Sequence, residues 1–166
     1  VLGGNIQIHA AGYRAKVDSN PLLPLTDDSA VVKAALSQPN VIAATRRINT
    51  AGLVSNREGA FSTSIIGIEP VLEAPVSLIS QHITEGRWLT AEDQDSILVG
   101  RGLADAMGLK AGDRFTMVGS DIHKQNRQRT MTVIGIYDIG ITSIEKTVVY
   151  ISLSEAQRLF GLPGQS

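Results

Sequence analysis

The apolar residues of this chain fall in short runs separated by glycine, proline and polar turns, and this spacing does most to limit the possible folds. No run approaches the roughly 18 to 20 residues that a membrane-spanning helix needs. Aromatic residues make up only 4% of the chain, so valine, isoleucine, leucine and alanine must supply most of the core. Many of these side chains are β-branched or small, which favours a sheet accompanied by short helices. We therefore predict a fold of the α+β class.

Strands are predicted from period-two alternation and from short apolar runs bounded by turn residues. They cover residues 4–9, 41–48, 53–55, 61–68, 96–99, 115–118, 131–137 and 147–151. A turn at Ala51-Gly52 is expected to separate the second of these strands from the third.

Short helices are predicted from the residues that begin and end them. Asp27 and Asp28 stand at an N-cap position, and Ser154 is expected to cap the last helix. Pro70 suits the first position of a helix, where its missing N–H loses no bond, and Gly108 suits a left-handed C-terminal cap. The predicted helices cover residues 30–36, 71–74, 103–107 and a C-terminal segment with Ala156, Leu159 and Phe160.

The chain has 166 residues, enough for one domain or two small ones. From about Ile83 onward, glycine recurs at short intervals and the predicted strands suggest a small barrel-like unit. No internal repeat and no proline- or serine-rich linker divides the sequence. We therefore expect two lobes joined by tight connections, with a boundary near Ile83. Because Val1 leads almost directly into a predicted strand, we also expect the chain to be a piece of a longer protein.

Charge and cysteine content argue against several functional classes. Lysine and arginine number 15 against 16 acidic residues, the net charge is -1, and no basic tract exceeds two residues. A nucleic-acid partner is therefore not expected. Cysteine is absent, which excludes disulfides, thiolate metal sites and a cysteine nucleophile, and fits an oxidising compartment.

A phosphate-binding loop is best matched at Gly100-Arg101-Gly102, which follows an apolar strand and precedes a helix. The match fails at Asp105, where a dinucleotide fingerprint needs glycine or alanine for close helix packing. We interpret the segment as a turn from strand to helix and predict no cofactor.

Metal and catalytic patterns are also weak. His9, His82 and His123 lie far apart, without the spacing that places two ligands on one helix face. Neither residues 62–67 nor Gly119-Ser120-Asp121 supplies a Gly-x-Ser-x-Gly nucleophile elbow. We predict no catalytic, cofactor-binding or metal-binding residues, and therefore no enzyme.

Paired acids occur at Asp27-Asp28 and in the run Glu92-Asp93-Gln94-Asp95. Acid–base catalysis could use such pairs, but both precede predicted regular elements and are interpreted as helix-cap or solvated-turn residues. Trp88 is interpreted as a ring that holds a turn between the lobes, with a role as partner anchor as the alternative. Residues 120–130 are modestly basic and are interpreted as a solvated hairpin, with contact to anionic lipid or an acidic partner as the alternative.

One succession of segments is recognisable as a whole. It consists of Ile83-Thr84-Glu85-Gly86-Arg87-Trp88-Leu89, then acidic residues, Ile97-Leu98-Val99-Gly100, Leu103-Ala104 and Leu109-Lys110-Ala111-Gly112-Asp113. This order resembles the MacB-like periplasmic core domain of ABC transporter permeases of the FtsX superfamily, of the MacB and LolC/LolE types. Residues 4–9, 46–53, 67–70, 133–137 and 149–157 also occupy family-like positions, so the resemblance covers essentially the whole chain.

The resemblance implies a porter-like α/β subdomain built from both chain ends, residues 1–82 and 141–166, with a small β-rich subdomain inserted at residues 83–140. It implies that Val1 and Ser166 lie close together near the inner membrane, with the domain on the periplasmic or extracellular side. The membrane-anchored whole would work with a cytoplasmic ATPase subunit, with a second permease subunit as homo- or heterodimer, and with a possible periplasmic adaptor or carrier. The domain would then transmit mechanical movement to cargo.

The cargo stays open in the sequence. No obvious extra hairpin of the kind that lipoprotein-releasing members use to recruit a soluble carrier is present, so lipoprotein, lipid, peptide and drug are all alternatives. A second functional class also stays open, namely a free-standing extracytoplasmic module that binds a ligand or protein in the cleft between the lobes.

Overall fold

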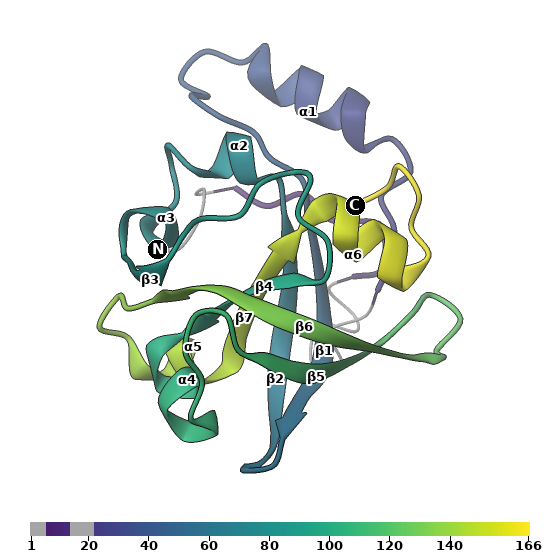
Figure 1. Ribbon diagram of the computed structural model, residues 1–166. Coiled ribbons are helices and arrows are strands. Elements are labelled where there is room, and N and C mark those ends of the chain that lie inside the picture. The colour runs from purple at the N-terminus through teal and green to yellow at the C-terminus, as the bar shows by residue number, and fades with distance from the viewer. Residues whose placement is uncertain (1–5, 14–21) are drawn as a thin grey trace.

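The structure is a computed structural model that describes residues 6–13 and 22–166, and it has the predicted α+β class (Figure 1). The helices are α1 (Asp28–Leu36), α2 (Pro70–Glu73), α3 (Leu78–Gln81), α4 (Arg101–Met107), α5 (Thr142–Thr147) and α6 (Leu153–Phe160). The strands are β1 (Arg47–Asn56), β2 (Gly59–Ile68), β3 (Ile83–Gly86), β4 (Ser96–Gly100), β5 (Arg114–Ser120), β6 (Asn126–Tyr137) and β7 (Val148–Ser152).

The strands form a single mixed sheet in the order β3-β6-β4-β7-β2-β1-β5. Because β5 also pairs with β6, every strand except β3 belongs to a closed ring. The hairpins β1–β2 and β5–β6 are antiparallel, whereas β2 with β7 and β4 with β6 are parallel. The ring therefore joins strands that are far apart in the sequence.

Side chains of the central strands alternate between two hydrophobic clusters. Ile97 and Val99 of β4 lie in the larger cluster, while Leu98 between them lies in the smaller one. In the same way Val149 of β7 belongs to the larger cluster and Tyr150 to the smaller. Strands buried on both faces need apolar residues at every position, which explains the unbroken apolar runs in these two segments.

Helix α6 covers the larger cluster and is defined by clear end signals. The Ser152 hydroxyl accepts a hydrogen bond from the Glu155 N–H at 3.1 Å, and Gly161 ends the helix at φ 74°. Ala156 and Phe160 are buried in the larger cluster. The cap is thus Ser152 and not Ser154, because β7 runs directly into the helix two residues earlier than predicted.

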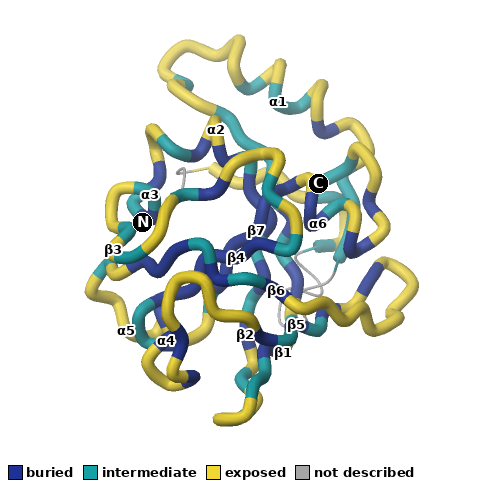
Figure 2. Tube along the Cα trace, viewed as in Figure 1, coloured by how far each residue is buried: buried dark blue, intermediate teal, exposed yellow. Residues whose placement is uncertain are grey.

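Helix α1 lies on the surface, at one end of the molecule (Figures 1 and 2). Asp28 is its only buried residue, although most of its other residues are apolar. Asp27 occupies the N-cap position as predicted, but its side chain makes no capping hydrogen bond.

Several predicted elements are confirmed in place. Strands β2, β4 and β7 and helices α1, α2 and α4 coincide with the predicted segments to within a few residues. Gly108 takes the expected left-handed conformation, at φ 64° and ψ 33°. Pro70 stands at the start of α2 as predicted.

Three predictions about the first strands are wrong. Residues 6–9 form no strand, and residues 4 and 5 lie outside the described part of the chain. Residues 41–46 form no strand either, and β1 passes through Ala51 and Gly52 without a turn. The glycine is needed for close packing, because a Cβ at Gly52 would collide with the Ile65 side chain and lie 2.8 Å from the Val118 carbonyl oxygen.

The sheet continues across both predicted subdomain boundaries. Strand β5 pairs with β1, and β4 pairs with β7. The division into residues 1–82, 83–140 and 141–166 stays a prediction. Val1 lies outside the described residues, whereas the Ser166 carbonyl oxygen accepts a hydrogen bond from the Leu25 N–H at 2.7 Å.

Candidate functional site

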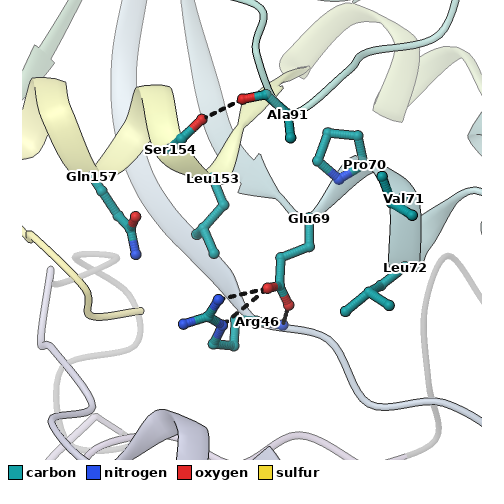
Figure 3. Close-up of a pocket in the computed structure, with 9 residues that line it drawn as sticks. All are labelled: Arg46, Glu69, Pro70, Val71, Leu72, Ala91, Leu153, Ser154 and Gln157. Atoms are coloured by element: carbon teal, nitrogen blue, oxygen red, sulfur yellow. Dashed lines mark hydrogen bonds and ion pairs between the residues drawn. The ribbon is translucent and has the colours of Figure 1, made fainter.

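A shallow hollow of about 260 Å³ lies between α2 and the first turns of α6 (Figure 3). Its position follows from two chain junctions, since Glu69 links β2 to α2 and Leu153 follows β7. The lining residues are Arg46, Glu69, Pro70, Val71, Leu72, Ala91, Leu153, Ser154 and Gln157.

Arg46 and Glu69 form the polar wall of the hollow. The Glu69 carboxylate accepts hydrogen bonds from the Arg46 backbone N–H at 2.8 Å, from Nη2 at 2.7 Å and from Nε at 3.1 Å. The hydrogen bond to Glu69 is the largest cause that raises the pKa of the Arg46 guanidinium. Asp28 of α1 adds a longer contact, 3.5 Å from Arg46 Nη1. This cluster ties the surface helix to the start of α2.

A second ion pair stands beside the first and is more deeply buried. Glu73, whose side chain is 2% exposed, accepts from Arg47 Nε at 2.6 Å and from Nη2 at 2.7 Å. The Thr45 hydroxyl donates to the same carboxylate at 2.9 Å. This hydrogen bonding holds the pKa of the Arg47 guanidinium above its usual value. Both glutamates are therefore committed to arginine, which suits positioning and not proton transfer.

The other wall of the hollow is apolar. Val71 and Leu72 of α2 are 73% and 46% exposed, so this wall presents apolar side chains to solvent or to a bound group. Ser154 donates its hydroxyl to the Ala91 carbonyl oxygen at 2.8 Å (Figure 3). A site of this kind can hold an apolar group beside a neutralised ion pair.

The Gly100-Arg101-Gly102 segment is a turn from β4 to α4, as interpreted from the sequence. A Cβ at Gly100 would collide with the Glu145 backbone, so α5 fills the space above the turn. Arg101 instead donates to Glu85 Oε1 at 2.9 Å and to the Thr84 hydroxyl at 2.9 Å. Gly100 therefore allows close packing between the β4–α4 junction and α5.

The histidines occupy separate places. His9 stacks on Tyr13 with ring centroids 4.0 Å apart, and His82 Nδ1 lies 2.8 Å from the Leu78 carbonyl oxygen. His123 lies in the β5–β6 turn, where its backbone N–H donates to Asp121. Within residues 6–13 and 22–166, no three histidine or acidic side chains gather as a metal site would require.

The acids of residues 92–95 are turn residues, as interpreted, and one of them accepts several hydrogen bonds. Asp93 accepts from Arg87 Nη1 at 2.8 Å, from Nη2 at 2.7 Å and from the Thr90 N–H at 2.8 Å. Arg87 is the main cause that lowers the pKa of the Asp93 carboxyl. Trp88, next to this turn, donates its indole N–H to the Pro70 carbonyl oxygen at 2.9 Å and packs on the smaller cluster.

Sequence reasoning did not find the paired charges of the hollow. The available signal was the adjacent pair Arg46 and Arg47 at the start of a strand, together with Glu69 and Glu73 four residues apart on either side of Pro70. Residues four apart share a helix face, which would have placed both carboxylates on one side of α2. Nothing local shows that the arginines face them.

The closed mixed sheet and the ion-paired hollow define a non-repetitive α+β domain held by packing and by buried charge pairs. The sequence profile of the MacB-like periplasmic core domain family matches residues 3–165. The chain therefore belongs to that family, and it is the extracytoplasmic domain of an ABC transporter permease family. The resemblance indicated by the sequence is confirmed.

One solved structure shares the fold. The extracellular domain of the noncanonic ABC-type transporter YknZ from Gram-positive bacteria is similar at 12% identity and a TM-score of 0.57, covering 85% of this chain and 75% of its own. A permease protein domain from Porphyromonas gingivalis aligns at 16% identity and a TM-score of 0.49, covering 75% of this chain and 56% of its own. Across the described residues, no helix is both long and apolar enough to cross a bilayer.

Proposed function

We propose that this domain couples ATP hydrolysis in the cytoplasm to the movement or release of cargo outside the inner membrane. The family match over residues 3–165 is the observation that carries the proposal. The intact permease subunit would continue into membrane segments, work with an ATPase subunit and pair with a second permease subunit. The cargo would be a lipoprotein, a lipid, a peptide or a drug, and a periplasmic adaptor or carrier would be a further partner.

The two partly buried charge pairs support a mechanical role. Arg46 and Arg47 hold the start of β1 against α2 through Glu69 and Glu73. Such contacts fix the relative position of elements that a pushing or rotating motion would otherwise shear. The domain would then move as a body and pass displacement from the membrane helices to the cargo. The three-part division into residues 1–82, 83–140 and 141–166 is part of this proposal.

Sidedness can be tested with a thiol engineered into these 166 residues, which contain no cysteine of their own, in a full-length permease whose other cysteines are replaced by serine. Arg57 stands in the β1–β2 turn with its side chain 91% exposed, so Arg57→Cys should disturb little. In intact cells that produce the full-length permease, a membrane-impermeant maleimide should label this thiol. Labelling that occurs only after the cells are lysed would place the domain on the wrong side and end the proposal.

Coupling can be tested by spin-label distances in the full-length permease, purified with its ATPase subunit. One label at Arg57→Cys and one in the membrane part should change their separation between the nucleotide-free and the vanadate-trapped state. As a matched control, labels at Arg57→Cys and at Lys110→Cys, an exposed position, should keep a constant separation if the domain moves as a body. An unchanged separation in the first pair would contradict coupling through this domain.

A further inference from the structure

Strand β6 is the longest strand of the sheet, and one of its two edges is only partly covered. Over residues 126–132 it pairs with β5 on one side, as the register Ser120↔Asn126 to Arg114↔Thr132 shows. On the other side β4 pairs only from Thr132 onward, where Ser96 meets it. The first half of β6 therefore has no strand on its β4 side among the described residues.

The hydrogen-bond pattern shows which backbone groups face this open edge. In the β5–β6 turn the Asp121 N–H donates to the Gln125 carbonyl oxygen at 2.9 Å, so odd-numbered residues of this half of β6 point their backbone groups toward β5. Thr132, an even-numbered residue, points the other way and donates its N–H to the Asp95 carbonyl oxygen at 2.8 Å. Asn126, Gln128 and Thr130 must then point their N–H and C=O groups away from β5.

These backbone groups are open to solvent. Residues 126–130 are all exposed, and no part of the chain that the structure describes bonds to the backbone of Asn126, Gln128 or Thr130 on this side. Strand β4 begins only at Ser96, and the residue before it, Asp95, has a left-handed φ of 47° and does not continue the strand. Exposed edges of this kind are templates for pairing with another strand.

A hollow with arginine side chains runs along the same edge. It measures about 420 Å³ and lies between residues 126–129 and the end of α6, where Arg158 and Leu159 line it. Arg127 is paired with Asp121 at 2.7 Å, and Arg158 with Glu155 at 2.7 Å. Arg129 has no carboxylate partner among the described residues, so its charge is left uncompensated.

We propose that the β4-side edge of β6, residues 126–130, binds an extended acidic segment of a partner protein as an added strand. The backbone groups of Asn126, Gln128 and Thr130 would pair with the backbone of the segment. Its acidic side chains on the α6 side would lie against Arg129, with Arg127 and Arg158 beside it. Main-chain pairing would supply the affinity and the arginines the preference for acidic sequence. The inference goes beyond the proposed transport role and does not depend on it.

Charge favours an acidic partner over a second copy of this chain. If two copies paired through this edge, the arginines of both would meet across the new ladder, and like charges on facing strands are destabilising. The same arginines therefore protect the edge against self-association while leaving it open to a segment of opposite charge.

The test uses a capped heptapeptide of alternating glutamate and valine as a probe, added to the 166-residue chain. Its binding would be followed by NMR titration of backbone amides and by amide hydrogen exchange. We expect saturable shifts centred on residues 126–130, with exchange at Asn126, Gln128 and Thr130 slowed at least about tenfold at saturation. The same peptide with lysine in place of glutamate should not bind.

Two variants separate the main-chain from the charge contribution. Gln128→Pro removes an outward-facing N–H without removing a bond to β5 and should abolish binding, whereas Gln128→Thr keeps the N–H and should leave the affinity unchanged. Arg129→Gln should weaken binding at least about threefold and flatten its salt dependence. Because Arg129 is exposed, this variant remains informative even if Gln128→Pro does not fold.

Three outcomes would overturn the proposal. The acidic peptide could fail to bind at millimolar concentration, or it could bind with its protected amides outside residues 126–130. Alternatively, sedimentation could show that the chain dimerises and that Gln128→Pro abolishes the dimer, which would identify the edge as a contact between copies.

Discussion

Glu73 is a buried carboxylate that pairs with an arginine. Its oxygens lie 2.6 and 2.7 Å from Arg47 and 2.9 Å from the Thr45 hydroxyl. Glu73→Gln would remove the buried negative charge that pairs with Arg47, and removing one partner of a buried pair is costly. Because Arg47 is partly exposed, at 27%, we expect the free energy of unfolding to fall by about 2 kcal/mol, as measured by urea denaturation.

The matched control is Glu58→Gln. Glu58 also pairs with an arginine, Arg57 at 3.1 Å, but its side chain is 50% exposed and that of Arg57 is 91% exposed. Exposed pairs contribute little, so we expect a change below about 0.5 kcal/mol. Equal losses in the two variants would show that burial does not set the strength of the Glu73 pair.

Asp93 should make stability depend on pH in the acidic range. Its pKa is lowered in the folded chain, mainly by the hydrogen bonds from Arg87. The pKa of an unfolded aspartate is about 3.9. Because the folded pKa of Asp93 is lower, its ionised carboxylate stabilises the folded chain fully above about pH 3.9. This stabilisation is lost as the pH falls through the folded pKa. Asp93→Asn should therefore lower the free energy of unfolding by about 1 kcal/mol at pH 7 and by clearly less at pH 2.5.

Urea denaturation at both pH values checks this prediction, with Asp105→Asn as the control. Asp105 is 68% exposed and lies 4.0 Å from Arg101, so its replacement should have the same small effect at both pH values. A loss for Asp93→Asn that does not change with pH would mean that the carboxylate charge contributes nothing.

Strand β2 and helix α6 are packed so closely that only glycine fits at one position. A Cβ at Gly67 would lie 2.5 Å from the Cβ of Ala156. Gly67→Ala should cost about 2 kcal/mol through overpacking, and Ala156→Gly about 1 kcal/mol through helix propensity. Because Ala156→Gly makes room for the new methyl group, the double variant should lose at least about 1 kcal/mol less than the sum.

The comparison is a double-mutant cycle measured by urea denaturation. Combining Gly67→Ala with Ala34→Gly, on the exposed face of α1, provides a pair without contact, whose losses should add. If the Gly67 and Ala156 changes also added without coupling, the contact between β2 and α6 would not be the reason for glycine at this position.

Elements with strong local signals could be predicted from the sequence. The local sequence alone predicts the apolar strands β4 and β7, the start of α2 at its proline and the end of α4 at its glycine. The role of Gly52 could not be predicted from the sequence. Glycine is required there because the Ile65 side chain on the neighbouring strand and the Val118 carbonyl oxygen on another strand leave no room for a Cβ. A glycine that permits close approach and a glycine that makes a turn look the same in one sequence.

The candidate site could not be predicted from the sequence for a related reason. Arg46 and Glu69 are 23 positions apart, and only the β1–β2 hairpin brings them together. Glutamate is usually exposed, so the sequence does not indicate that Glu73 is buried. The open edge of β6 depends on where β4 stops, which is likewise a property of the assembled sheet.

At the scale of the whole molecule, the closed ring of strands makes distant parts of the chain depend on one another. Strand β7 near the C-terminus lies between β4 and β2, and β5 closes the ring between β1 and β6. Loss of any one of the six strands of the ring opens it and exposes the larger cluster, so the ring should unfold as one cooperative unit. A domain that transmits displacement needs this property, because a body that yields locally cannot pass on force.

Hydrogen exchange measured residue by residue can show whether this cooperative unit exists. Strands β4 and β7 are buried on both faces and bonded on both edges, so their amides should exchange only through global unfolding. Helix α1 buries only Asp28, so its amides should open locally, with protection at least about a hundredfold lower. Similar, intermediate protection in α1, β4 and β7 would instead indicate a sheet that opens strand by strand, and such a sheet could not move as a rigid body.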